Sequence, residues 1–304
     1  MTDRIEIISP VDGSVYATRP YTSQAEVEAV LSQARAVQAE WASVAIAERA
    51  RLALAAVDAM LAMREEIVPE LAWQMGRPVR FGGGELGGFE ERARHMIAIA
   101  EDALAPLEPE PKEGFRRYIK REPLGVVLVI APWNYPYLTA VNSVIPALMA
   151  GNAVILKHAG QTLLVGERFE AAMAAAGLPE GLFANLVLSH DQTAAIIGSG
   201  RVDQVNFTGS VAGGQAMERA AAGTFAGLGL ELGGKDPAYV RADADLGHAV
   251  ENLVDGAFFN SGQSCCGIER IYVHGDKFDA FVDGFAALTR EYVLGSPLDA
   301  ETTL

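Results

Sequence analysis

Cysteine is nearly absent from this 304-residue chain, and its only two cysteines, Cys265 and Cys266, are adjacent. Two cysteines cannot form a disulfide framework, so we expect a reducing compartment, the cytoplasm. The chain also has no apolar signal region at its start and no run of about 18 apolar residues. These absences predict a protein that has no membrane partner.

Basic residues are also scarce. The chain has 24 Lys and Arg against 39 Asp and Glu, a formal net charge of −15, and no run of Lys or Arg. This balance excludes nucleic acid as an expected partner. An anionic ligand would need a local site, such as a helix N-terminus with one well-placed lysine. The five histidines are scattered and form no CxxC or HExxH pattern, so no metal site is predicted.

Hydrophobic residues make up half of the chain, and its length favours two domains of roughly 150 residues each. Apolar residues recur at helical spacing over 24–41, where Ser23 is the expected N-cap, and over 46–75. Between these segments and a helix expected at 89–104 lies the glycine cluster FGGGELGG, residues 81–88. The cluster follows a helix rather than a strand, so a flexible turn is favoured over a phosphate loop.

An exposed strand is expected at 115–121, directly after the proline-marked segment 107–114. Short apolar strands then alternate with helices. This alternation predicts an α/β fold, a Rossmann-like parallel sheet covered by helices, with ligands at the carboxyl ends of the strands. A second α/β unit begins near 234, which divides the chain into 1–233 and 234–304. The expected strands are 126–132, 153–157, 183–189, 204–210, 225–234 and 270–274, and the expected helices are 138–150, 163–176, 191–198, 211–222, 246–260 and 276–291.

Polar groups stand where several of these strands end. Asn134 lies in the turn APWNYP, where its amide is either an oxyanion donor or an ordinary turn residue. Lys157 closes an apolar strand and can reach a ribose or phosphate, although taken alone it is better explained as a surface lysine whose amino group extends to solvent. Gly209, Ser210 and Gly214 surround a helix N-terminus whose free N–H groups suit a phosphate.

Glu231 and the cysteine pair are the remaining reactive groups. Glu231 stands in an apolar strand end, where burial would raise its pKa and suit it to general-base chemistry; a structural ion pair is the alternative. The cysteines could be core residues, a strained disulfide, metal ligands or a nucleophile with a neighbour. Their polar surroundings, NSGQSCCG, favour the nucleophile.

The segments PWNYP, FTGS, LELGGK and NSGQSC, in this order, resemble the motifs of the aldehyde dehydrogenase superfamily, and the resemblance extends over the whole chain. It implies that Cys265 is the nucleophile, five residues before Arg270, and that Cys266 is a bystander. Glu231 then activates the hydrolytic water. Asn134 and the backbone N–H of Cys265 hold the oxyanion. The implied contacts to NAD or NADP are Trp133, Lys157, Gly209, Ser210, Gly214 and Leu232.

The activity implied by the resemblance is NAD(P)-dependent oxidation of an aldehyde to a carboxylic acid. Cys265 would form a thiohemiacetal and then a thioester, with hydride transfer to the nicotinamide between the two. A CoA-acylating or phosphorylating relative is the alternative enzyme, and retention of Glu231 favours hydrolysis instead. A catalytically impaired remnant that binds nucleotide is the alternative of another class.

Three features depart from the family pattern. Gly160 replaces a glutamate that often repels a 2′-phosphate, which predicts acceptance of both NAD and NADP. Asn142 replaces an arginine found in members that oxidise anionic semialdehydes. Together with Tyr137 and Leu138 it predicts a preference for neutral, moderately apolar aldehydes.

The third departure is length. Family members are longer, so the resemblance implies that the chain is truncated at its C-terminus and is poorly active and aggregation-prone by itself. In a complete chain, residues 109–124 would belong to an oligomerisation hairpin of a family-type homo-oligomer.

Overall fold

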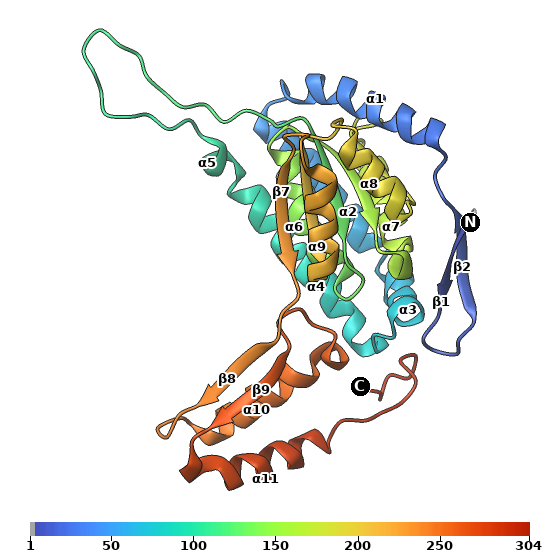
Figure 1. Ribbon diagram of the computed structural model, residues 1–304, viewed down its shortest axis with the longest axis vertical. Helices are drawn as coiled ribbons and strands as arrows, with labels where there is room; N and C mark the ends of the chain where they lie inside the picture. Colours follow the sequence, from blue (N-terminus) through green and yellow to red (C-terminus); the bar gives the residue numbers. More distant parts are fainter. Residues whose placement is uncertain (1–3) are drawn as a thin grey trace.

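The computed structural model describes residues 4–304, which form a large α/β unit followed by a smaller one (Figure 1). The chain begins with an antiparallel hairpin, β1 (Arg4–Ile8) and β2 (Val15–Pro20). Five helices follow before the main sheet begins. They are α1 (Gln24–Trp41), α2 (Ile46–Ala62), α3 (Arg64–Met75), α4 (Val79–Ala98) and α5 (Ala100–Leu104).

The first helix confirms the sequence prediction, including its cap. Ser23 Oγ accepts from the Glu26 N–H at 3.3 Å, and the Glu26 carboxylate accepts from the Ser23 N–H at 2.8 Å. This reciprocal pair satisfies two of the free donors of the first turn. The single helical segment expected over 46–75 is wrong, because α2 and α3 are separated at Met63. Apolar spacing continues across this break, so periodicity does not reveal it.

The glycine cluster is helical, so the flexible turn expected at 81–88 is wrong. These residues lie inside α4, and the helix expected over 89–104 is instead the end of α4 followed by α5. Glycine lowers helix propensity, but close packing favours it here. A Cβ at Gly82 would lie 2.9 Å from Val68 Cγ1, and one at Gly88 would lie 2.7 Å from Leu138 Cδ1.

The main sheet has five parallel strands in the order β5-β4-β3-β6-β7, which confirms the predicted fold class. Helices lie between successive strands and pack against the sheet (Figure 1). Because all five strands are parallel, their carboxyl ends lie along one edge. The elements are β3 (Val126–Ala131), α6 (Pro136–Met149), β4 (Ala153–His158), α7 (Leu164–Ala175), β5 (Phe183–Asn185), α8 (His190–Gly198), β6 (Gln204–Gly209), α9 (Val211–Ala221) and β7 (Gly227–Leu232).

The two central strands form the centre of the hydrophobic core. Every residue of β3 and β4 is buried, as expected of strands covered on both faces. The edge strands differ. β5 is shorter than the segment predicted at 183–189, and β7, whose only partner is β6, is partly exposed.

Residues 105–122 form an exposed arm that extends away from the body of the molecule (Figure 1). The strand expected at 115–121 is absent from it. Two isolated bridges, Leu107 to Ile119 and Lys112 to Phe115, are its only β pairings. With no neighbouring strand to complete a ladder, the arm lacks regular β structure.

The smaller unit contains a parallel pair of strands, β8 (Asp236–Val240) and β9 (Ile268–Val273), with α10 (Leu246–Phe258) and α11 (Phe278–Thr289). Its core has four buried hydrophobic residues, Val240, Val250, Val254 and Phe281. The sequence did not predict β8, which contains Pro237.

Short 3-10 turns occur at η1 (Gly160–Thr162), η2 (Phe259–Gly262) and η3 (Gly275–Lys277). No helix within residues 4–304 has the length and apolar character needed to cross a membrane.

Candidate active site

The cysteine pair follows an unusual turn at the end of α10. In η2, Asn260 and Ser261 have left-handed backbone conformations, with φ of 52° and 58°, and Gly262 follows with φ of 73°. Non-glycine residues rarely adopt this conformation, and asparagine tolerates it better than serine. Such strained conformations persist where surrounding contacts hold them, and they are frequent at functional sites.

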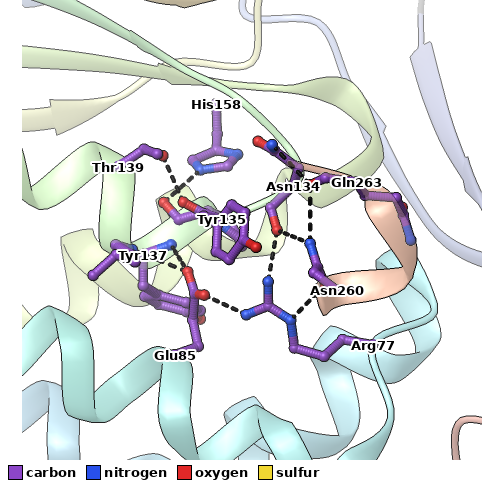
Figure 2. A network of polar contacts seen from close by, with 11 residues as sticks. Arg77, Glu85, Asn134, Tyr135, Tyr137, Thr139, His158, Asn260 and Gln263 are labelled. Carbon is purple, nitrogen blue, oxygen red and sulfur yellow. Dashed lines mark hydrogen bonds and ion pairs between the residues drawn. The ribbon is translucent and has the colours of Figure 1, made fainter. Parts of the chain in front are cut away.

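Asn134, which the sequence placed among the candidate site residues, lies against this turn. Its side-chain amide donates to the carbonyl of Gln263 at 3.0 Å. In the opposite direction, Asn260 Nδ2 donates to the carbonyls of Asn134 at 3.0 Å and Gln263 at 3.1 Å (Figure 2). The turn after β3 and the loop before Cys265 are therefore joined by hydrogen bonds. The second N–H of the Asn134 amide has no acceptor among residues 4–304.

Both cysteines are free and exposed, which removes the core and disulfide explanations. Partial desolvation raises the pKa of the Cys265 thiol, and the neighbouring Cys266 raises it further. No cationic side chain of residues 4–304 lowers the pKa of this thiol. The Cys265 carbonyl accepts from the Gly234 N–H at 3.2 Å, which ties the cysteine loop to the segment after β7.

Glu231 lies on β7 opposite Thr208, and β8, α10 and η2 separate it in the chain from the cysteines. The burial expected from its sequence neighbours is wrong, because its carboxylate is exposed. The reason is its position on an edge strand whose neighbours in the sequence are apolar but only partly buried. No hydrogen bond or ion pair reaches the carboxylate within the described part of the chain, so it remains accessible to water.

Lys157 is buried near the carboxyl end of β4, so a surface lysine is the wrong explanation. Burial lowers the pKa of its amino group, since the charged form loses hydration. No carboxylate of residues 4–304 lies within ion-pair distance of it. A buried ammonium without a protein partner suits an anionic or hydroxyl-rich ligand.

The N-terminus of α9 begins at Ser210, whose Oγ accepts from the Gly213 N–H at 3.1 Å. Gly214 is buried beneath Leu232, since a Cβ there would lie 2.7 Å from Leu232 Cδ2. Gly209 ends β6 in register with Leu232. Four of the six residues expected to contact a dinucleotide, Gly209, Ser210, Gly214 and Leu232, thus lie together where β6 and β7 end and α9 begins. A fifth, half-buried Trp133, lies in the turn after β3.

Two residues beneath this site were missed at the level of sequence. Arg77 and Glu85 form an ion pair whose side chains are only 5% and 1% exposed. Arg77 also donates to the Asn134 carbonyl at 2.7 Å and to Asn260 Oδ1 at 3.0 Å (Figure 2). A glutamate within a run of glycines was the available signal, but the assumption of a flexible turn hid it.

A cavity of about 240 Å³ adjoins the same network. Tyr135, Leu138 and Phe259 form apolar parts of its wall, and Arg80 adds a cation. Tyr137 does not take part, contrary to its expected place near a substrate tunnel. It is fully buried and stacks on Phe169 in the core.

The five-stranded parallel sheet and the free, exposed cysteines describe an α/β protein with accessible thiols. The model of the Aldehyde dehydrogenase family matches residues 1–304. The chain therefore belongs to the aldehyde dehydrogenase family, as its motifs predicted.

Individual relatives agree with this assignment. A succinate-semialdehyde dehydrogenase [NADP(+)] of Mycolicibacterium paratuberculosis is 35% identical over 301 residues, which cover 98% of this chain and 64% of the relative. The structure of an NAD-dependent aldehyde dehydrogenase from Sinorhizobium meliloti has a TM-score of 0.92 and 32% identity, covering 98% and 60%. A succinic semialdehyde dehydrogenase from Streptococcus pyogenes, in complex with NADP+, has a TM-score of 0.94 and 26% identity, covering 99% and 66%. The chain thus spans less than two thirds of these relatives.

Proposed function

We propose that this protein oxidises an aldehyde to a carboxylic acid with NAD or NADP, through a covalent bond to Cys265. The observation that supports this most directly is the 3.0 Å bond from Asn134 to Gln263, because it places an amide donor beside the loop of an exposed thiol. A nucleophile and an adjacent oxyanion donor are the parts that acyl-transfer chemistry requires.

The first step is addition of the Cys265 thiolate to the aldehyde carbon, which moves a negative charge onto the aldehyde oxygen. The free N–H of the Asn134 amide and the backbone N–H of Cys265 stabilise this charge. Neither N–H has another acceptor within residues 4–304. Because desolvation and Cys266 raise the pKa of the thiol, a base is needed to remove its proton at neutral pH.

NAD or NADP, when bound, accepts the hydride that leaves the thiohemiacetal carbon. Lys157 and the N-terminus of α9 suit the ribose and phosphate groups of such a cofactor, and Gly214 and Leu232 pack beside them. Trp133, Gly209 and Ser210 complete the proposed cofactor contacts. Glu231 then takes a proton from water, which attacks the Cys265 thioester and releases the acid and the thiolate.

The test is formation of reduced cofactor with a panel of aldehydes. We expect Cys265→Ser to abolish turnover and Asn134→Ala to lower it by about 10²–10³-fold, with cofactor binding unchanged. Glu231→Gln should leave a stoichiometric burst of reduced cofactor without turnover, because the thioester is not hydrolysed. Cofactor binding without a burst in the unmodified chain would instead support the nucleotide-binding remnant.

A second candidate substrate class is an aldehyde with a carboxylate at its other end. Arg80 lines the cavity beside Leu138, and no carboxylate of the described residues lies within 4 Å of its guanidinium nitrogens. The preference for neutral aldehydes, predicted because Tyr137, Leu138 and Asn142 present no cation, is still untested, and Arg80 is a cation which that prediction did not consider. The relatives named for succinate semialdehyde favour the same class.

Arg80→Gln tests this class directly. If Arg80 pairs with the substrate carboxylate, KM for succinate semialdehyde should rise by about tenfold or more while KM for a neutral aldehyde of equal length changes little. Arg92→Gln, an exposed arginine of the same helix, is the control. If both substitutions change KM equally for both substrates, Arg80 does not pair with the substrate carboxylate, and the prediction of neutral aldehydes stands as it was.

A further inference from the structure

The buried ion pair of Arg77 and Glu85 has no part in the chemistry proposed above, yet it contacts the turn that carries Asn134 (Figure 2). Arg77 follows the left-handed residue Gly76 at the end of α3, and Glu85 lies inside α4. Burial of two charges is unfavourable unless both are paired and their remaining donors and acceptors are satisfied. The contacts of this pair therefore indicate what it holds in place.

Arg77 uses all three of its guanidinium nitrogens. Nη1 donates to Glu85, Nη2 donates to the Asn134 carbonyl at 2.7 Å, and Nε donates to Asn260 Oδ1 at 3.0 Å. The planar group also lies over the Tyr135 ring, 4.9 Å from its centre. A lysine has the charge but not the planar fork, so it cannot make these contacts together.

Glu85 fixes the other side of the same turn. Its Oε1 accepts from the backbone N–H groups of Tyr137 at 2.9 Å and Leu138 at 3.0 Å. These are donors of the first turn of α6, which have no partner within the helix. Glu85 thus sets where α6 begins, and the residues immediately before it display Asn134.

Asn260 connects the ion pair to the cysteine loop. Its Oδ1 accepts from Arg77, and its Nδ2 donates to the carbonyls of Asn134 and Gln263. Asn260 is the first residue of the left-handed turn, a conformation that needs contacts of this kind to persist. Arg77 therefore contacts both segments of the site, which are the turn that carries Asn134 and the loop that leads to Cys265.

We propose that Arg77 and Glu85 are positioning residues for the oxyanion site. They hold the Asn134 amide and the Cys265 backbone N–H at the separation that one aldehyde oxygen requires, although neither side chain contacts the substrate oxygen. This inference rests on the proposed function. Its physical basis is that small displacements of preorganised donors reduce rate far more than they reduce substrate binding.

The experiment compares Arg77→Lys and Glu85→Gln with Arg49→Lys. Arg49 is a matched control, because it is buried and donates to the carbonyls of Met149 and Ala42, away from the site. We expect Arg77→Lys to lower kcat by about 10²-fold, with KM within about threefold of wild type and cofactor affinity unchanged. Glu85→Gln should have a smaller effect, since its amide oxygen still accepts from α6. Arg49→Lys should leave kcat unchanged.

Hydrogen exchange gives a second measurement that does not depend on turnover. Backbone amides of residues 259–267 should exchange faster in Arg77→Lys than in Arg49→Lys, while those of β3 and β4 stay protected. If an unmodified chain binds cofactor but oxidises no aldehyde, the proposed function fails, and exchange of this loop still decides the positioning role. Wild-type exchange in Arg77→Lys, or a kcat loss equal to that of Arg49→Lys, would overturn the inference.

Discussion

At the residue scale, Cys265 differs from Cys266 through its neighbours. We expect an aldehyde-mimicking electrophile to label Cys265, so that Cys265→Ala abolishes labelling and Cys266→Ala preserves it. Desolvation and Cys266 raise the pKa of the Cys265 thiol, so its labelling rate should rise with pH through a midpoint above that of a free cysteine. Removing Cys266 removes one cause, and the midpoint should move to lower pH. Mass spectrometry of labelled peptides checks both statements, and equal labelling of the two single variants would contradict them.

Gly160 determines a second prediction at this scale. With no carboxylate at Gly160 to repel a 2′-phosphate, the affinities for NAD and NADP should agree within tenfold, a difference of ~1.4 kcal/mol. Gly160→Glu should weaken NADP binding selectively. A Cβ at this position would lie 2.5 Å from Ile5 Cδ1, a flexible terminal methyl that can move.

Gly160→Ala is the control for that contact, because it adds the Cβ without the charge. Isothermal titration with both cofactors measures the ratio for each variant. An unmodified chain that prefers NAD by more than about a thousandfold, ~4 kcal/mol, would show that another residue supplies the discrimination.

At the scale of elements, the glycine-rich helix α4 offers a comparison within one segment. A Cβ at Gly87 would meet nothing within 4 Å, so Gly87→Ala should stabilise the protein by about 0.5–1 kcal/mol. A Cβ at Gly82 would meet the stiff side chain of Val68 at 2.9 Å, so Gly82→Ala should destabilise it by about 1–3 kcal/mol. Urea denaturation measures both, and effects of the same sign would contradict the packing argument.

The elements that the sequence predicted well are those whose residues all face similar surroundings. Strands β3 and β4 are buried on both faces and read as continuous apolar runs, which is why their positions and the parallel sheet could be predicted. The helix through the glycine cluster could not, because its stability depends on distant partners such as Val68 and Leu138. Local propensity was overridden by tertiary packing.

The same distinction applies to the site. Asn134 and Cys265 were expected together because each stands in a short motif that resembles one of the family, and their loops do meet. Arg77 and Glu85 stand eight residues apart, on either side of a helix start that the sequence did not reveal. Their contacts with Asn134 and Asn260 arise from folding alone. The exposure of Glu231 was missed for a related reason, since an edge position cannot be read from apolar neighbours.

At the scale of the whole molecule, the two units differ greatly in their cores. The smaller unit has four buried hydrophobic residues, whereas Tyr239, Tyr272 and Phe278 remain more than half exposed. We expect its amides to exchange faster than those of β3 and β4, and urea to unfold it first. Cofactor binding should then persist at urea concentrations that abolish labelling specificity at Cys265. Uniform protection across residues 4–304 would contradict this order.

The exposed arm has a consequence for cleavage of the chain. It contains Lys112, Arg116, Arg117, Lys120 and Arg121, all exposed, and trypsin cleaves after such residues. Brief digestion should nick the chain there first, because flexible exposed segments fit a protease and packed helices do not. The fragments before and after the nick should still migrate together without denaturant, since the helices of the first pack on the sheet of the second. A single polypeptide would thereby become two non-covalently associated pieces that share one hydrophobic core.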